Sequence, residues 1–140
     1  MNKKTICVID GQGGGIGTAI IKEIKKTFGE NFEIIALGTN AIATMTMLSA
    51  GANKGATGEN AIGFCCNRCD YIVGAISIVY PNSMLGELTE KMASYICMST
   101  AKKILIPLSQ EKIEIVGLKK EPLPHLVKEL VDKIKQLEEN

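Results

Sequence analysis

The sequence predicts an α/β domain of three layers, in which helices cover both faces of a doubly wound, Rossmann-like and mostly parallel β-sheet. Short apolar runs alternate with amphipathic segments along the chain, as in α/β proteins. The first apolar run enters a loop with five glycines in seven positions, and a helical pattern follows it. The chain has 140 residues, a length that suits one domain, so we expect residues 1–140 to form a single domain.

The first half of the chain predicts three strands and three helices in alternation. Apolar residues recur every four positions from Ile16 to Phe28, which gives the first helix a face that can pack on the sheet. Gly29 and Gly51 follow the first two helices, and glycine commonly ends a helix. The expected strands are Thr5–Ile9, Phe32–Leu37 and Asn53–Ala56, and the expected helices are Gly15–Phe28, Ala41–Ala50 and Asn60–Cys69.

The second half predicts further strands and helices of the same layers. Pro81-Asn82-Ser83 indicates the start of a long helix. Only four residues separate the last two apolar runs, a gap that suits a hairpin, so we expect an antiparallel edge strand. The expected strands are Asp70–Ile76, Lys103–Leu108 and Ile113–Val116, and the expected helices are Met84–Thr100 and one that begins near Pro122 or Pro124.

The glycine-rich loop is the main functional signal. Glycine at a strand-to-helix turn lets backbone N–H groups approach a phosphate, because no Cβ obstructs them. Its spacing is similar to that of short-chain dehydrogenases more than to the commoner G-x-G-x-x-G. We therefore predict that the loop binds a small phosphorylated ligand. The predicted binding residues are Gly11, Gln12, Gly13, Gly14, Gly15, Ile16 and Gly17.

An internal echo adds helix starts to this site. Gly38-Thr39-Asn40 recurs twenty places later as Gly58-Glu59-Asn60, and asparagine is a favoured helix cap. Helices that follow parallel strands begin at one edge of the sheet, and each start carries a partial positive charge. These residues are either simple caps or part of the ligand crevice, and the crevice set is Gly38, Thr39, Asn40, Gly58, Asn60 and Ser83.

Carboxylates are expected on the same rim. Asp10 directly precedes the glycines, and Glu59 and Glu87 lie at expected loops or helix starts. A carboxylate beside a phosphate can hold Mg²⁺, bind a sugar hydroxyl or act as a base, so Asp10 and Glu59 are the candidate catalytic residues. The alternatives are that Asp10 caps the glycine turn and that the two glutamates complement helix dipoles.

The cluster Cys65-Cys66-x-x-Cys69 invites a metal or redox interpretation. Three thiols do not complete a structural zinc site, and the sequence holds no second C-x-x-C motif. We expect no metal site and small buried thiols instead, with a metal or redox centre at Cys65, Cys66 and Cys69 as the alternative.

Composition excludes several partners. The net charge is +1 and no basic block is present, which argues against nucleic acid. No apolar run approaches the ~20 residues that span a bilayer, so we expect a cytoplasmic protein without membrane contact. The last helix carries an apolar stripe that packs on the sheet or pairs with a second copy, and we expect a homo-oligomer.

The cofactor is left open by the sequence. An NAD site has an acidic residue where the second strand ends, but Gly38, Thr39 and Asn40 stand there, which favours NADP over NAD among dinucleotides. None of the tyrosines belongs to a Tyr-x-x-x-Lys pair. A nucleotide, a flavin phosphate, a coenzyme A fragment or a phosphorylated metabolite suits the chain's size. The protein is then either a small enzyme or a non-catalytic ligand sensor or oligomeric scaffold.

Five segments together resemble a known family: VIDGQGGGIG, ALGTNAIAT, GATGENAI, NSMLGELT and KKILIPL, in this order. They are similar to the bacterial family catalogued as domain of unknown function 3842, over nearly the whole chain. The resemblance implies a small Rossmann-like protein of anaerobic Gram-positive bacteria. It implies no particular activity, substrate or catalytic residue.

Overall fold

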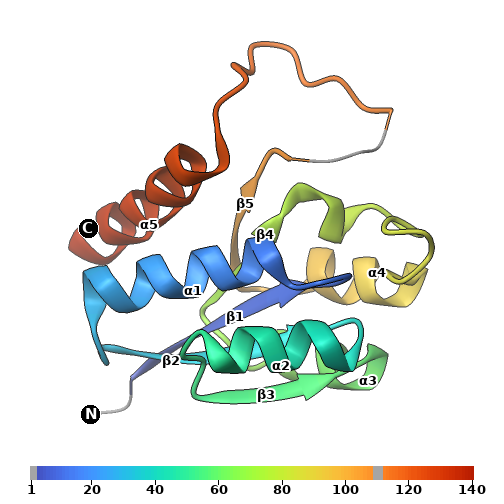
Figure 1. Cartoon of the computed structure of the whole chain (residues 1–140), viewed down its shortest axis with the longest axis horizontal. Helices are drawn as coiled ribbons and strands as arrows, with labels where there is room; N and C mark the ends of the chain where they lie inside the picture. Colours follow the sequence, from blue (N-terminus) through green and yellow to red (C-terminus); the bar gives the residue numbers. More distant parts are fainter. Residues whose placement is uncertain (1–2, 109–111) are drawn as a thin grey trace.

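The computed structural model describes residues 3–108 and 112–140, which form a five-stranded sheet between two layers of helices (Figure 1). The strands are β1 (Lys4–Asp10), β2 (Phe32–Gly38), β3 (Lys54–Thr57), β4 (Tyr71–Ala75) and β5 (Lys102–Ile106). The helices are α1 (Gly15–Phe28), α2 (Ala41–Ser49), α3 (Glu59–Cys66), the 3₁₀ helix η1 (Ile76–Val79), α4 (Glu90–Met98) and α5 (Leu123–Glu139). The strand order is β3-β2-β1-β4-β5 and all described pairs are parallel, which confirms the predicted α/β class.

Two apolar cores lie on opposite faces of the sheet. Side chains alternate along β1, so that Ile6 and Val8 pack with α1, α2 and α5, whereas Cys7 and Ile9 pack with α3 and α4. The stripe of α5 is buried in the first core, and α5 contacts both α1 and β5. Within the described ranges, no helix is both long enough and apolar enough to cross a membrane.

The predicted antiparallel edge strand is wrong. Residues 113–116 form no strand, and β5 is the edge of the sheet that the structure describes. Residues 112–120 are instead an exposed part of the connection from β5 to α5, which lies away from the sheet in Figure 1. Apolar composition and a short gap suggested a hairpin, but neither provides the reversal after β5 that a hairpin needs.

The predicted helix Met84–Thr100 is wrong in its first part. Met84 and Leu85 have φ of 58° and 57°, in the left-handed region, which a right-handed helix excludes. Residues 80–88 therefore form successive turns, and α4 begins only at Glu90, where the Thr89 hydroxyl accepts a hydrogen bond from Met92 N at 3.1 Å. Ser83 is not a helix start; it is buried, and its hydroxyl donates to Ser77 O at 2.6 Å.

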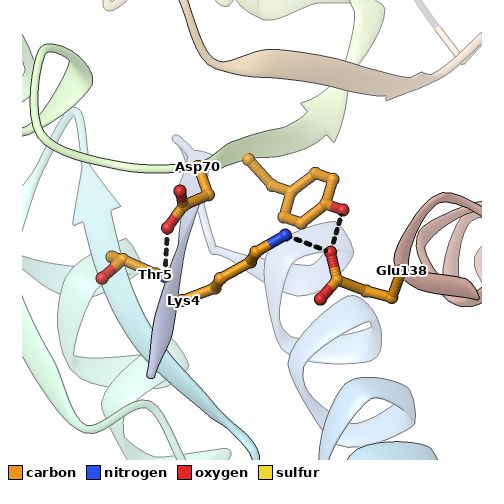
Figure 2. Close-up of polar contacts among 5 residues, drawn as sticks. Lys4, Thr5, Asp70 and Glu138 are labelled. Carbon is orange, nitrogen blue, oxygen red and sulfur yellow. Dashed lines mark hydrogen bonds and ion pairs between the residues drawn. The ribbon is translucent and has the colours of Figure 1, made fainter. Parts of the chain in front are cut away.

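Polar contacts join the amino ends of the central strands to the end of α5 (Figure 2). Lys4 Nζ lies 2.9 Å from Glu138 Oε2, and the Tyr71 hydroxyl donates to the same oxygen. Asp70 Oδ2 accepts from Thr5 N at 2.8 Å. This edge of the sheet is thus closed by structural contacts, and the glycine loop lies at the opposite, carboxyl edge.

Candidate functional site

The glycine loop lies where the strand order reverses. The chain moves from β1 outward to β2 and β3, and then returns to the other side of β1 as β4. Ligands of open α/β sheets bind in the crevice at the carboxyl ends of the strands beside such a reversal. Two segments that are distant in sequence meet at this edge of the sheet, namely the loop after β1 and the turns of residues 80–88 after β4.

Asp10 fixes the shape of the loop. Its side chain is buried, Oδ1 accepts from Gly11 N at 2.8 Å, and Oδ2 accepts from Gly17 N at 2.7 Å. Burial raises the pKa of Asp10, and the N–H groups of Gly17, Gly11 and Ile16 oppose that rise. Both oxygens of Asp10 thus accept hydrogen bonds from the glycine turn. This is the arrangement expected for its alternative role, a cap of that turn.

The glycines of the loop fall into two groups. A Cβ on Gly11 would lie 2.5 Å from Thr39 Oγ1, and one on Gly17 would lie 2.4 Å from Met47 Sδ. Gly14 has φ of 76°, which favours glycine. A Cβ on Gly13 or Gly15 would meet nothing within 4 Å. Close packing therefore requires the first group, whereas the second group faces open space at the start of α1.

Glu87 is the residue that sequence reasoning underestimated. Its Oε1 accepts from Gln12 N at 2.8 Å, from Thr39 Oγ1 at 2.7 Å and from Asn40 Nδ2 at 2.9 Å. The Gln12 N–H, followed by the Thr39 and Asn40 donors, holds the pKa of Glu87 below its ordinary value against the effect of burial. The sequence indicated that Glu87 lies on the rim, but its position inside a supposed helix concealed its contacts with the end of β2.

Asn40 connects α2 to the glycine loop. Its Oδ1 accepts from Ala43 N at 2.9 Å, so the predicted cap is confirmed, and its Nδ2 also donates to Gln12 O at 3.0 Å. Gly38 ends β2 in close packing, because a Cβ there would lie 2.2 Å from Thr44 Oγ1. Gly38, Thr39 and Asn40 thus come together with the loop as predicted from their position.

The second copy of the motif is built differently. Gly58, with φ of 101°, precedes α3 without a side-chain cap, and Asn60 is the second residue of the helix, so the predicted cap at Asn60 is wrong. Glu59 Oε2 accepts from Thr89 Oγ1 at 2.6 Å. Glu59 therefore ties the start of α3 to the start of α4, and the described contacts do not link it to the glycine loop.

The N–H groups of the loop are only partly available. Gly11 and Gly17 donate to Asp10, Gln12 donates to Glu87, and Gly14 N donates to Gly11 O at 3.0 Å. Among residues 3–108 and 112–140, neither Gly13 N nor Gly15 N donates a hydrogen bond. An anion at this loop would meet those two groups and the positive end of α1.

Cys7 and Cys66 are buried in the apolar core that packs with α3 and α4. Burial raises the pKa of Cys66 to about 12. The neighbouring Cys69 thiol, together with burial, raises the pKa of Cys7. Within the described part of the chain, no group of three or more His, Cys, Asp or Glu side chains is placed to hold a metal ion. Cys65, Cys66 and Cys69 therefore do not form such a group.

Comparison with known proteins supports the architecture and gives the family. No curated protein matches the sequence. A crystal structure described as a dodecameric FMN-dependent Ubix-like decarboxylase from Escherichia coli O157:H7 has a similar fold, with a TM-score of 0.51 and 14% sequence identity over 98% of this chain and 94% of that chain. At this identity the likeness concerns the fold alone. Residues 5–139 match the family described as domain of unknown function (DUF3842), and the chain therefore belongs to this family.

Proposed function

We propose that the protein binds a small phosphate-containing ligand, with the phosphate at the N–H groups of Gly13 and Gly15. The observation that carries this proposal is the contrast within the loop. Neighbouring N–H groups are held by Asp10 and Glu87, whereas Gly13 and Gly15 face open space at the start of the 14-residue helix α1. A phosphate there gains hydrogen bonds and the field of the helix.

Glu87 selects the neighbouring part of the ligand. It stands beside Thr39 and Asn40 at the end of β2, where Rossmann proteins place an acid that binds ribose hydroxyls. Its hydrogen bonds to the described residues use Oε1, so Oε2 is the oxygen that a ligand hydroxyl would reach. The ionised carboxylate would repel a 2′-phosphate, which removes the preference for NADP over NAD that the sequence suggested.

FMN is the first ligand to test. It combines one terminal phosphate with a chain of hydroxyl groups, and the structure of similar fold belongs to an FMN-dependent protein. Other mononucleotides and phosphorylated metabolites share this pairing of phosphate and hydroxyls. The proposal is one of binding, because Asp10 and Glu59, the candidate catalytic residues, have oxygens engaged with the loop and with Thr89.

Gly15→Glu separates binding from folding. An acidic residue in the first turn suits the helix dipole, and a Cβ at Gly15 meets nothing within 4 Å, so the variant is expected to fold with unchanged thermal stability. Its carboxylate repels a phosphate, so its affinity is expected to fall at least about tenfold. Gly15→Ala is the matched control and should retain binding.

The measurement is a titration with FMN, AMP, ADP, NAD and coenzyme A, followed by fluorescence, calorimetry and thermal unfolding. A bound ligand at a hundred times its Kd should stabilise the wild-type protein by about 2.7 kcal/mol. Conversion of a bound ligand on incubation would indicate an enzyme, and intact recovery would favour a sensor. Absence of any stabilisation, or full binding by Gly15→Glu, would refute the proposal.

A further inference from the structure

The edge strand β5 has two unequal halves. It begins with Lys102 and Lys103, and lysine on an edge strand discourages pairing with other chains. Its second half is apolar and only partly buried at Ile104 and Leu105, and Pro107 follows it. In the sheet that the structure describes, β5 pairs with β4 on one side only. The apolar half therefore presents an unguarded edge.

An open, mainly apolar pocket lies beside this edge. It is lined by residues 104–107 and by Leu126 and Leu130 of α5, with Glu129 and Lys133 as its charged members. The pocket thus offers apolar contacts and one charge of each sign next to a strand edge. These are the features that an added β-strand needs, because its backbone pairs with the edge while its side chains enter neighbouring pockets.

The same chain carries an apolar segment that is left outside both cores. Ile113, Ile115, Val116 and Leu118 are 50%, 41%, 99% and 48% exposed. Ile113 and Ile115 alternate with Glu114, so that in an extended conformation the two isoleucines share one face. Lys112 and Glu114 supply one charge of each sign, which complements the pair in the pocket. Isoleucine and valine also favour strands.

We propose that residues 112–115 of one copy pair with β5 of a second copy, with the isoleucines in the pocket between β5 and α5. The occupant is a second copy because one chain carries both an open edge and an exposed segment that matches it. The segment lies away from its own sheet (Figure 1). Exchange of such complementary parts between identical chains is an accessible route to a dimer. This interface is independent of the ligand site.

The test compares Ile115→Glu with Ile42→Glu in the full chain. Ile42 is 70% exposed on α2. Its variant therefore adds the same surface charge as Ile115→Glu, but at a site outside β5, α5 and the segment that connects them. Both positions are exposed, and circular dichroism and thermal unfolding should show that both variants fold. Sedimentation velocity over a range of concentrations gives the oligomeric state, and hydrogen exchange of the β5 amides reports on the edge.

Wild-type protein and Ile42→Glu are expected to associate with a similar Kd, and the β5 amides should become protected as concentration rises. Ile115→Glu is expected to raise the Kd at least about tenfold and to remove that protection. A monomeric wild-type protein would overturn the proposal. So would association that Ile115→Glu leaves unchanged, or protection of β5 that is independent of concentration, which would place the segment on the edge of its own chain.

Discussion

The Glu87 carboxylate accepts a hydrogen bond from the backbone nitrogen of Gln12 at 2.8 Å, across 75 positions of sequence. The bond joins the turns after β4 to the loop after β1, so one side chain connects these two segments. Because Thr39 and Asn40 donate to the same oxygen, Glu87 also reaches the end of β2.

The stabilising effect of Glu87 should depend on pH. Its pKa is lowered in the folded protein, so its contribution is present above the ordinary value of about 4.3 and is lost as pH falls through the folded pKa. In urea unfolding, the free energy of unfolding of Glu87→Gln should fall less between neutral and acid pH than that of the wild-type protein, because the variant has no carboxylate to protonate at this position. Glu90→Gln, which changes an exposed acid of α4, is the control and should follow the wild-type curve.

Gly11→Ala should be much more damaging than Gly13→Ala. A Cβ on Gly11 would lie 2.5 Å from Thr39 Oγ1, 2.6 Å from Met84 Sδ and 2.9 Å from Glu87 Oε1, whereas one on Gly13 meets nothing within 4 Å. We expect a loss of about 1–3 kcal/mol in the free energy of unfolding for Gly11→Ala and a change within about 0.5 kcal/mol for Gly13→Ala. Equal effects in chemical denaturation would contradict the described packing.

Asp10→Asn should weaken the loop without changing the size of the side chain. An amide offers one acceptor oxygen, so either Gly11 N or Gly17 N would face the NH₂ group and lose its partner. We expect a loss of about 1–3 kcal/mol in the free energy of unfolding. Hydrogen exchange should accelerate at the loop more than in β5, and uniform acceleration would instead indicate general destabilisation.

Tyr71→Phe tests the contacts that close the amino edge of the sheet. The substitution removes the hydroxyl that donates to Glu138, and we expect a loss of about 1 kcal/mol in the free energy of unfolding. Lys4→Met removes the exposed partner of Glu138 and should cost less. Thermal unfolding of both variants checks this order, and a larger effect of Lys4→Met would show that the ion pair is the main anchor.

Local patterns were enough to predict the framework. Helix α1 has the predicted bounds, because a helical apolar stripe lies between two glycine signals, and the Asn40 cap follows from its own residue type. The third strand and the parallel order of the sheet also agree with the alternation of apolar runs and helices. In these elements, local preference and tertiary packing favour the same conformation.

The errors occur where distant contacts decide the backbone. Met84 and Leu85 are ordinary helix residues in composition, yet both adopt positive φ in the turn that brings Glu87 to Gln12. No local pattern contains that pairing. The apolar run at residues 113–116 has strand-like composition, but a strand requires a partner, and composition does not specify where the partner lies. The cap of α3 lies two residues before its expected position, with Gly58 at the cap in place of Asn60.

The two bonds from Asp10 have a consequence for the energetics of recognition. A loop with five glycines would be expected to sample many conformations, and ordering each residue costs about 1–2 kcal/mol. Here the carboxylate restrains both ends of the loop through hydrogen bonds within the protein itself. The conformational entropy has then already been lost, so more of the interaction energy would appear as affinity. The abundance of glycine in this loop thus provides room for close approach rather than mobility.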